Sequence, residues 1–214
     1  MRVISWRLEN KQGLTLAGFM QEKKTKRSKS PLSGGAGDPV VVLGNRDRGG
    51  AYILRFRLDS NLRVRLGRFK NGQQVRFEKG VYLYVGSAMG SWQTLGRRVA
   101  RHASRSGTKR GHGIREEIVA VFGPNVLPKG EKHLRWHVDY VLERQAVEVT
   151  HVLAICSHQR MEGEIADRLL SDEETRIVAP GLGASDAAGK THILRAPEPI
   201  AWWQGLSEQM RVLE

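Results

Sequence analysis

The hydrophobic period changes near residue 90, and this change constrains the fold more than any other feature of the sequence. Before it, apolar residues alternate with polar ones over 51–58, 62–69 and 80–87, as they do in strands. After it, Leu95 and Val99 lie four residues apart, and helical spacing continues to Ser104. Turn signals at Asp59-Ser60-Asn61 and Asn71-Gly72 separate the strands. We therefore expect an antiparallel meander followed by a helix.

The rest of the chain predicts further short elements. We expect a helix at 114–122, a strand at 147–155, a helix at 161–170 and a short strand at 192–195. Residues 136–142 fit either a helix or a strand. The order of elements indicates one α+β domain, with a small antiparallel or mixed sheet flanked by helices. We place this domain at residues 40–198, with a C-terminal extension at 199–214.

Residues 1–39 have the composition of a flexible basic tail. They contain the charge run Lys23-Lys24-Thr25-Lys26-Arg27-Ser28-Lys29-Ser30, followed by Gly34-Gly35-Ala36-Gly37. Such a stretch buries too little apolar surface to offset its ordering entropy. The alternative is an electrostatic arm that contacts nucleic acid.

Charge favours a polyanionic partner. The chain has 35 Lys and Arg against 22 Asp and Glu, a net charge of +13. Nucleic acid fits this surplus better than a membrane, because no apolar run of about 18 residues is present. The alternative is a protein that is merely soluble and basic. Cys156, the single cysteine, excludes an internal disulfide and a Cys-based zinc site. The first residues lack a secretion signal, so we expect a cytoplasmic location; the oligomeric state stays open.

Two neighbouring segments carry the candidate site. Tyr82 and Tyr84 share a face of one strand beside Gly86, either as an anion-facing surface or as ordinary aromatic packing. On the following helix, Arg98 and His102 share the face of the apolar residues that dock on the sheet. An arginine there needs an anion, either a phosphate or a carboxylate such as Asp139 or Glu164. A separate basic ridge, expected to contact phosphates, consists of Arg97, Arg101 and Arg105.

These segments resemble the GIY-YIG nuclease superfamily, which includes excision-repair nucleases and intron-homing endonucleases. The resemblance rests on Gly50-Ala51-Tyr52, Tyr84-Val85-Gly86 and Leu95-x-x-Arg98-Val99-x-x-His102. Three further runs resemble one branch of the superfamily, a domain of unknown function. They are residues 80–88, residues 136–142 (similar to HWHIDYLL) and residues 181–186 with His192 (similar to GFGSSD…SHL). The resemblance covers roughly residues 48–196.

The resemblance implies a three-stranded core, here with an extra hairpin at 58–79, and a metal-dependent nuclease acting on DNA. One of the phenols of Tyr52 and Tyr84 would help activate water, and Arg98 would stabilise charge on the phosphate, with His102 close by. Glu164 would hold a divalent metal, Mg²⁺ or Mn²⁺, with Glu162 as its rival. The alternatives are a non-catalytic nucleic-acid-binding module that retains the fold, or a structural protein whose GIY-YIG residues only pack.

The roles of His137 and Asp139 have two interpretations. On a strand they would share a face and could bind metal, with Asp139 replacing or joining Glu164; on a helix they would diverge. The alternative is a structural hydrogen-bonding pair that supports Arg98 or the sheet. The chain departs from the branch in a basic insertion between His102 and Trp136, and in lacking cysteines after residue 186.

Overall fold

The computed structural model describes residues 4–9, 15–20, 37–184 and 190–211, and the chain divides into units 1–31 and 32–214. In the first unit, β1 (Ile4–Glu9) pairs antiparallel with β2 (Thr15–Met20). This pair occupies part of the stretch for which the sequence predicts a flexible tail. The basic run at 23–30 lies outside the described residues.

A mixed six-stranded sheet forms the centre of the second unit, in the order β3-β8-β4-β7-β10-β9. Its strands are β3 (Val40–Gly44), β4 (Gly50–Leu58), β7 (Gly80–Ala88), β8 (Val147–Cys156), β9 (Arg176–Ile177) and β10 (Ile193–Ala196). Strands β3 and β8 run parallel, and the other pairs of this sheet are antiparallel. The predicted α+β class and mixed sheet are confirmed. The sheet is wider than the expected three-stranded core because β3 extends one side and β10 and β9 extend the other.

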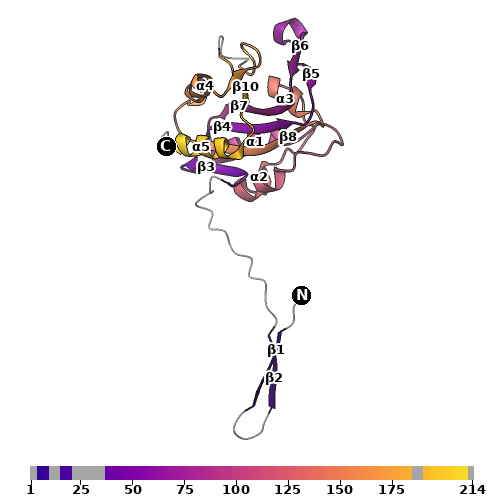
Figure 1. The fold of residues 1–214 in the computed structure, drawn as a ribbon, viewed down its shortest axis with the longest axis vertical. Coiled ribbons are helices and arrows are strands. Elements are labelled where there is room, and N and C mark those ends of the chain that lie inside the picture. Colours follow the sequence, from indigo (N-terminus) through magenta and orange to yellow (C-terminus); the bar gives the residue numbers. More distant parts are fainter. Residues whose placement is uncertain (1–3, 10–14, 21–36, 185–189, 212–214) are drawn as a thin grey trace. The chain divides into compact units, whose positions relative to one another are not determined.

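The predicted extra hairpin is a separate two-stranded sheet, β5 (Leu62–Arg65) with β6 (Gln74–Phe77). A short 3-10 turn, η1 (Phe69–Gly72), joins the two strands. Figure 1 shows this hairpin projecting from one end of the larger sheet. It thereby extends the surface beside α3, which contacts β5.

Helices cover both faces of the large sheet. The first face, which carries Tyr52 and Tyr84, packs against residues of α1 (Trp92–His102), α2 (Arg115–Phe122) and α3 (His137–Leu142). The second face packs against α4 (Glu162–Ser171) and α5 (Ile200–Met210), seen in orange and yellow in Figure 1. Because side chains alternate along a strand, neighbouring residues of β4 and β7 enter different cores. No helix among the described residues is long and apolar enough to cross a membrane.

Local signals explain where these helices lie. The Ser91 side chain caps α1 by accepting from the Thr94 amide at 3.3 Å. Gly96 allows α1 to approach its neighbours closely, since a Cβ there would lie 2.7 Å from the Phe122 ring. Within the predicted C-terminal extension at 199–214, α5 buries Trp203 in the second core.

Candidate active site

Three buried polar side chains from β4, α1 and α3 form a continuous chain of hydrogen bonds. The Tyr52 hydroxyl lies 2.9 Å from His102 Nε2, and His102 Nδ1 lies 3.2 Å from Asp139 Oδ1. All three residues are fully buried. Since an ionised Asp139 can only accept, His102 Nδ1–H donates to it and Nε2 accepts from the phenol. We call Tyr52, His102 and Asp139 the buried relay.

Burial and hydrogen bonding set the resting charges of the buried relay. Burial lowers the pKa of His102 despite the raising effect of Asp139, so the imidazole is neutral at pH 7. Burial alone would raise the pKa of Asp139, but hydrogen bonds from His102 and the Arg135 amide hold it well below its usual range. Burial raises the pKa of Tyr52 well above its ordinary value. The relay therefore rests as a phenol, a neutral imidazole and a carboxylate.

Tyr84 and Gly86 form the β7 side of the site. The Tyr84 ring meets the Tyr52 ring edge to face, with centroids 6.1 Å apart. Burial raises the pKa of Tyr84, and the charge of Glu162 adds to this effect. Gly86 lies opposite Tyr52 in the ladder, and a Cβ there would lie 2.5 Å from the Tyr52 hydroxyl oxygen. Only glycine at this position lets the Tyr52 phenol lie across β7.

Arg98 supplies an available positive charge. Its guanidinium carbon lies 4.0 Å from the centroid of the Trp136 ring, a cation–π stack. Among the described residues, the Arg98 side chain has no hydrogen-bond or ion-pair partner. Its charge acts to lower the pKa of Tyr52, Tyr84 and Glu162. The guanidinium is therefore within electrostatic reach of both phenols and of one carboxylate.

That carboxylate belongs to Glu162, at the start of α4. Ser87 donates a short hydrogen bond to Glu162 Oε2, and His192 Nδ1 lies 3.1 Å from Oε1. Burial alone would raise the pKa of Glu162, but the contacts with His192 and Ser87 hold it below its usual value. The β10–β7 ladder ends at Tyr84, and one further backbone bond joins Val85 to His192, so β10 does not reach Ser87, which contacts Glu162.

The structure does not bring Glu164 to this site. Its side chain is 50% exposed and pairs with Arg168 at 2.9 Å. It lines a 690 Å³ cavity between α4 and α5 on the second face of the sheet. Residues two apart on a helix point in different directions, so the side chains of Glu162 and Glu164 cannot both face the site. The structure places Glu162 there.

The predicted basic ridge is not a continuous solvent-facing surface. Of its three arginines, Arg97 is exposed and the other two are not. Arg101 donates to both oxygens of Asp139, at 3.0 Å each. The Arg105 side chain is 6% exposed and donates to the carbonyls of Leu142 and Arg110. The helix ends at His102, so Arg105 lies in the following loop and turns inward. The Arg101 and Arg105 side chains are thus engaged in hydrogen bonds within the protein.

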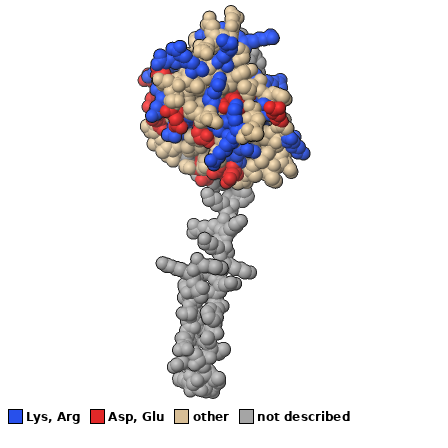
Figure 2. Space-filling view, turned by 90° about the vertical axis from the view of Figure 1, so that its right-hand side faces the viewer, with Lys and Arg blue, Asp and Glu red and all other residues tan. Residues whose placement is uncertain are grey.

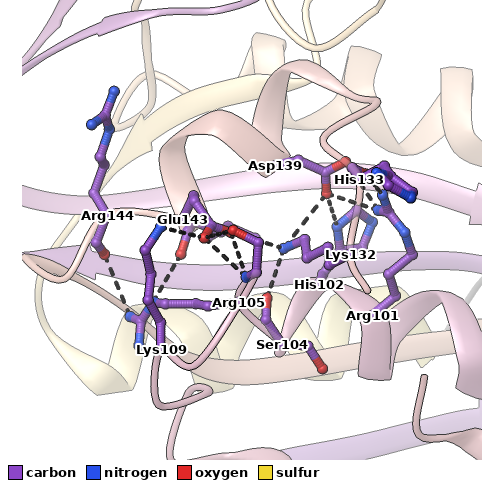
Figure 3. Close-up of polar contacts among 12 residues, drawn as sticks. Arg101, His102, Ser104, Arg105, Lys109, Lys132, His133, Asp139, Glu143 and Arg144 are labelled. Carbon is purple, nitrogen blue, oxygen red and sulfur yellow. Dashed lines mark hydrogen bonds and ion pairs between the residues drawn. The ribbon is translucent and has the colours of Figure 1, made fainter. Parts of the chain in front are cut away.

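The basic insertion after α1 is anchored by a buried ionic network (Figure 3). Lys132 is 1% exposed, donates to the Ser104 carbonyl at 2.7 Å, and lies 3.9 Å from Asp139 and 4.0 Å from Glu143. Glu143 accepts in turn from Lys109 at 2.7 Å. The insertion therefore places the buried Lys132 ammonium beside the Asp139 carboxylate of the relay. The sequence indicated no role for Lys132, because nothing local predicts that an insertion will fold back over α1.

Residues 137–142 form α3, with Trp136 as its N-cap residue, so His137 and Asp139 diverge and share no metal site. The Asp139 carboxylate accepts a hydrogen bond from the Trp136 amide at 3.0 Å, and this contact caps the start of the helix. His137 Nδ1 instead accepts the Gly183 amide at 3.2 Å. Asp139 accepts from His102 and Arg101, so it supports neither His137 nor Arg98 directly. Ser185 and Asp186 lie outside the described residues.

Comparison with known proteins gives a family match. The family described as "Domain of unknown function DUF123" matches residues 51–213, which include the buried relay, Arg98, Trp136 and Glu162. No curated protein and no solved structure matches the chain. The chain belongs to the DUF123 family of uncharacterised domains.

Proposed function

We propose that this chain is a metal-dependent phosphodiester nuclease that acts on DNA through a GIY-YIG-type site. The observation that carries the proposal is the position of Arg98. Its guanidinium stacks on Trp136, has no anionic partner among the described residues, and acts electrostatically on two buried phenols and on Glu162. A phosphate diester is the ligand that such a guanidinium fits best.

The buried relay suits general-base activation of water. In the proposed step, a water oxygen attacks phosphorus while the bond from phosphorus to the leaving sugar oxygen breaks. The water proton passes to the Tyr52 oxygen as the phenol proton passes to His102 Nε2, and the leaving oxygen takes a proton from solvent. Asp139 stabilises the imidazolium that forms, as a carboxylate does in acid–base relays. Arg98 counters the negative charge that develops on the phosphate.

A divalent metal, Mg²⁺ or Mn²⁺, fits Glu162. The carboxylate is ionised and partly exposed, with its side chain 24% accessible. Mg²⁺ is commonly held by one or two carboxylates together with water and substrate phosphate. When bound, such an ion supplies Lewis-acid polarisation of the phosphate. Glu164 is engaged by Arg168 and does not belong to this donor set.

The charge of the chain supports nucleic acid as the partner. The net charge is +13, and the side chains shown in Figure 2 include many lysines and arginines with acidic residues among them. Scattered positive charge of this kind contacts the phosphate backbone without reading sequence. It also raises the rate of encounter with a polyanion at low salt.

The test is cleavage of mixed single-stranded, duplex and branched DNA with Mg²⁺ or Mn²⁺. We expect wild type to cut, and Arg98→Ala to lose about a hundredfold to a thousandfold in rate, the usual effect of removing one charge-stabilising donor. Glu162→Gln should lose activity in the same way.

Glu164→Gln is the matched control, since it changes the same residue type on the same helix and should cut like wild type. Equal cleavage by wild type, Arg98→Ala and Glu162→Gln would refute the proposed site. Salt-dependent DNA binding without cleavage under either metal would instead favour the non-catalytic binding module.

A further inference from the structure

A second cavity lies beside the proposed active site. It has a volume of 540 Å³, within the range of small-molecule sites. Three segments that are distant in sequence line it: the turn between β5 and β6, the start of α3, and the loop before β10. Its lining side chains include Arg68, Phe69, Arg135, His137 and Tyr140.

The polar groups of this cavity suit an anionic ligand. Its charged lining residues are Arg68 and Arg135, and neither has an ion-pair partner among the described residues. His137 Nδ1 accepts the Gly183 amide, which places the imidazole proton on Nε2. Burial lowers the pKa of His137, so at neutral pH Nε2 is a neutral donor. The cavity therefore offers two guanidinium groups and one hydrogen-bond donor.

Part of its apolar surface is aromatic. The ring of Phe69 lies 4.9 Å from the ring of His137, and both side chains are partly exposed. Lys70 and Asn71, which follow Phe69, both adopt positive φ, at 47° and 57°. This left-handed conformation is unfavourable for Lys70, whereas asparagine tolerates it better than most residues. The chain thus accepts backbone strain in a turn that holds an aromatic ring at the cavity.

The position of the cavity ties it to the phosphate site. Arg135 and His137 line the cavity, and the residue between them is Trp136, on which Arg98 stacks. The cavity and the Arg98 site therefore border one another at Trp136, the arrangement that two neighbouring nucleotides of one strand would need. Aromatic rings and arginines are the groups on which proteins stack unpaired bases.

We infer that this cavity binds one unstacked nucleotide of the substrate strand, with its base against Phe69 and its phosphate on Arg68 and Arg135. The inference rests on the proposed function and adds a substrate class to it. A base inside a duplex is stacked and paired and cannot enter. The chain therefore prefers single-stranded DNA, or DNA with an unpaired nucleotide beside the cleaved phosphate.

The test measures binding of the full chain in EDTA, so that it does not depend on cleavage. Fluorescence anisotropy compares three probes: a short single strand, the same strand in a duplex, and a single strand of equal length whose sugars carry no bases. We expect the single strand to bind more tightly than either of the others. Phe69→Ala should weaken binding of the base-containing strand about fivefold or more, and leave the abasic strand unchanged.

Two further variants separate stacking from charge. Phe69→Tyr keeps the ring and should restore the preference for bases. Arg68→Ala should weaken both strands and reduce the salt dependence of binding, whereas Arg63→Ala, an exposed arginine of the same hairpin outside the cavity, should have little effect. Thermal melting checks that each variant folds.

Equal affinity for the base-containing and abasic strands would overturn the inference, as would a Phe69→Ala variant that loses affinity for both alike. These outcomes are distinct from failure of the nuclease proposal. A chain that prefers bases but never cuts retains the nucleotide site. A chain that cuts through Arg98 but ignores bases loses only the nucleotide site.

Discussion

The two faces of the large sheet bury polar groups in different ways. On the first face, both ring nitrogens of His102 are hydrogen-bonded, and the bonds run in one direction from Tyr52 to Asp139. On the second face, His151 Nδ1 and Trp203 Nε1 are buried without a partner among the described residues. A buried polar network that is fully paired fixes side-chain positions, whereas isolated polar atoms do not. In the proposed function, the first face therefore carries the buried relay, whereas the second face packs and contributes Glu162 at the start of α4.

The largest expected effect comes from removing the relay carboxylate. Asp139→Ala removes the buried carboxylate that pairs with Arg101 and faces Lys132, which should cost about 3–5 kcal/mol of unfolding free energy. Cleavage should also fall, because His102 loses the group that orients it. Denaturant unfolding and cleavage rates measure the two effects.

Trp203→Phe on the second face is the control for this difference. It removes an indole N–H that has no partner among the described residues, and it keeps most of the buried ring. We expect a loss of stability of about 1 kcal/mol or less, with DNA cleavage unchanged. If Trp203→Phe lowered cleavage as much as Asp139→Ala, the functional contrast between the faces would be wrong.

Two glycine substitutions sharpen the comparison. Gly86→Ala on the first face places a Cβ 2.5 Å from the Tyr52 hydroxyl oxygen, so Tyr52 must move and break its bond to His102. Such overpacking should cost about 1–3 kcal/mol and remove most cleavage. Gly163→Ala on α4 meets open space and should stabilise the helix by about 0.5–1 kcal/mol.

Thermal melting and cleavage assays on both glycine variants distinguish the two faces. The prediction fails if Gly86→Ala melts and cuts like wild type, since the Tyr52 ring would then not depend on glycine at this position.

The smallest expected effect is on pH dependence. Burial lowers the pKa of His151 to about 4, with a further contribution from Arg55, against about 6.5 in an unfolded chain. Between these values the unfolded state binds more protons, so the His151 contribution to stability is present above pH 6.5 and lost as pH falls toward 4. His151→Gln should make the melting temperature fall less steeply over this window. An unchanged pH profile would show that His151 has the same pKa in the folded and unfolded states.

Sequence pattern alone predicted most of the elements. The alternation in 51–58 and 80–87 predicted β4 and β7, and the Leu95, Val99 and His102 spacing predicted α1, because these periods report directly which side chains face a core. Residues 136–142 stayed ambiguous because so short a segment does not separate the two periods. The capping contact of Asp139 with the Trp136 amide explains the helix.

The site was predicted less completely, for reasons of geometry. Arg101 and Arg105 share the spacing of an exposed ridge, yet Asp139 and the carbonyl groups near residue 142 engage them. These partners are distant in sequence, with separations of 38 and 37 residues, so no local pattern reports them. The role of Lys132 could not be predicted for the same reason.

The sequence by itself determined the strand–helix order and the residues that could form a phosphate site, because periodicity and residue chemistry are local properties. Only the tertiary structure decided which of those residues meet. It gathered Tyr52, His102 and Asp139 from β4, α1 and α3 into one relay, and it placed Glu162 against Ser87 and His192 while Glu164 pairs with Arg168. The physical reason is that the fold sets the direction in which each side chain points. Two residues apart on α4, the two glutamates point to different sides of the helix, and the β10 ladder on β7 ends before Ser87.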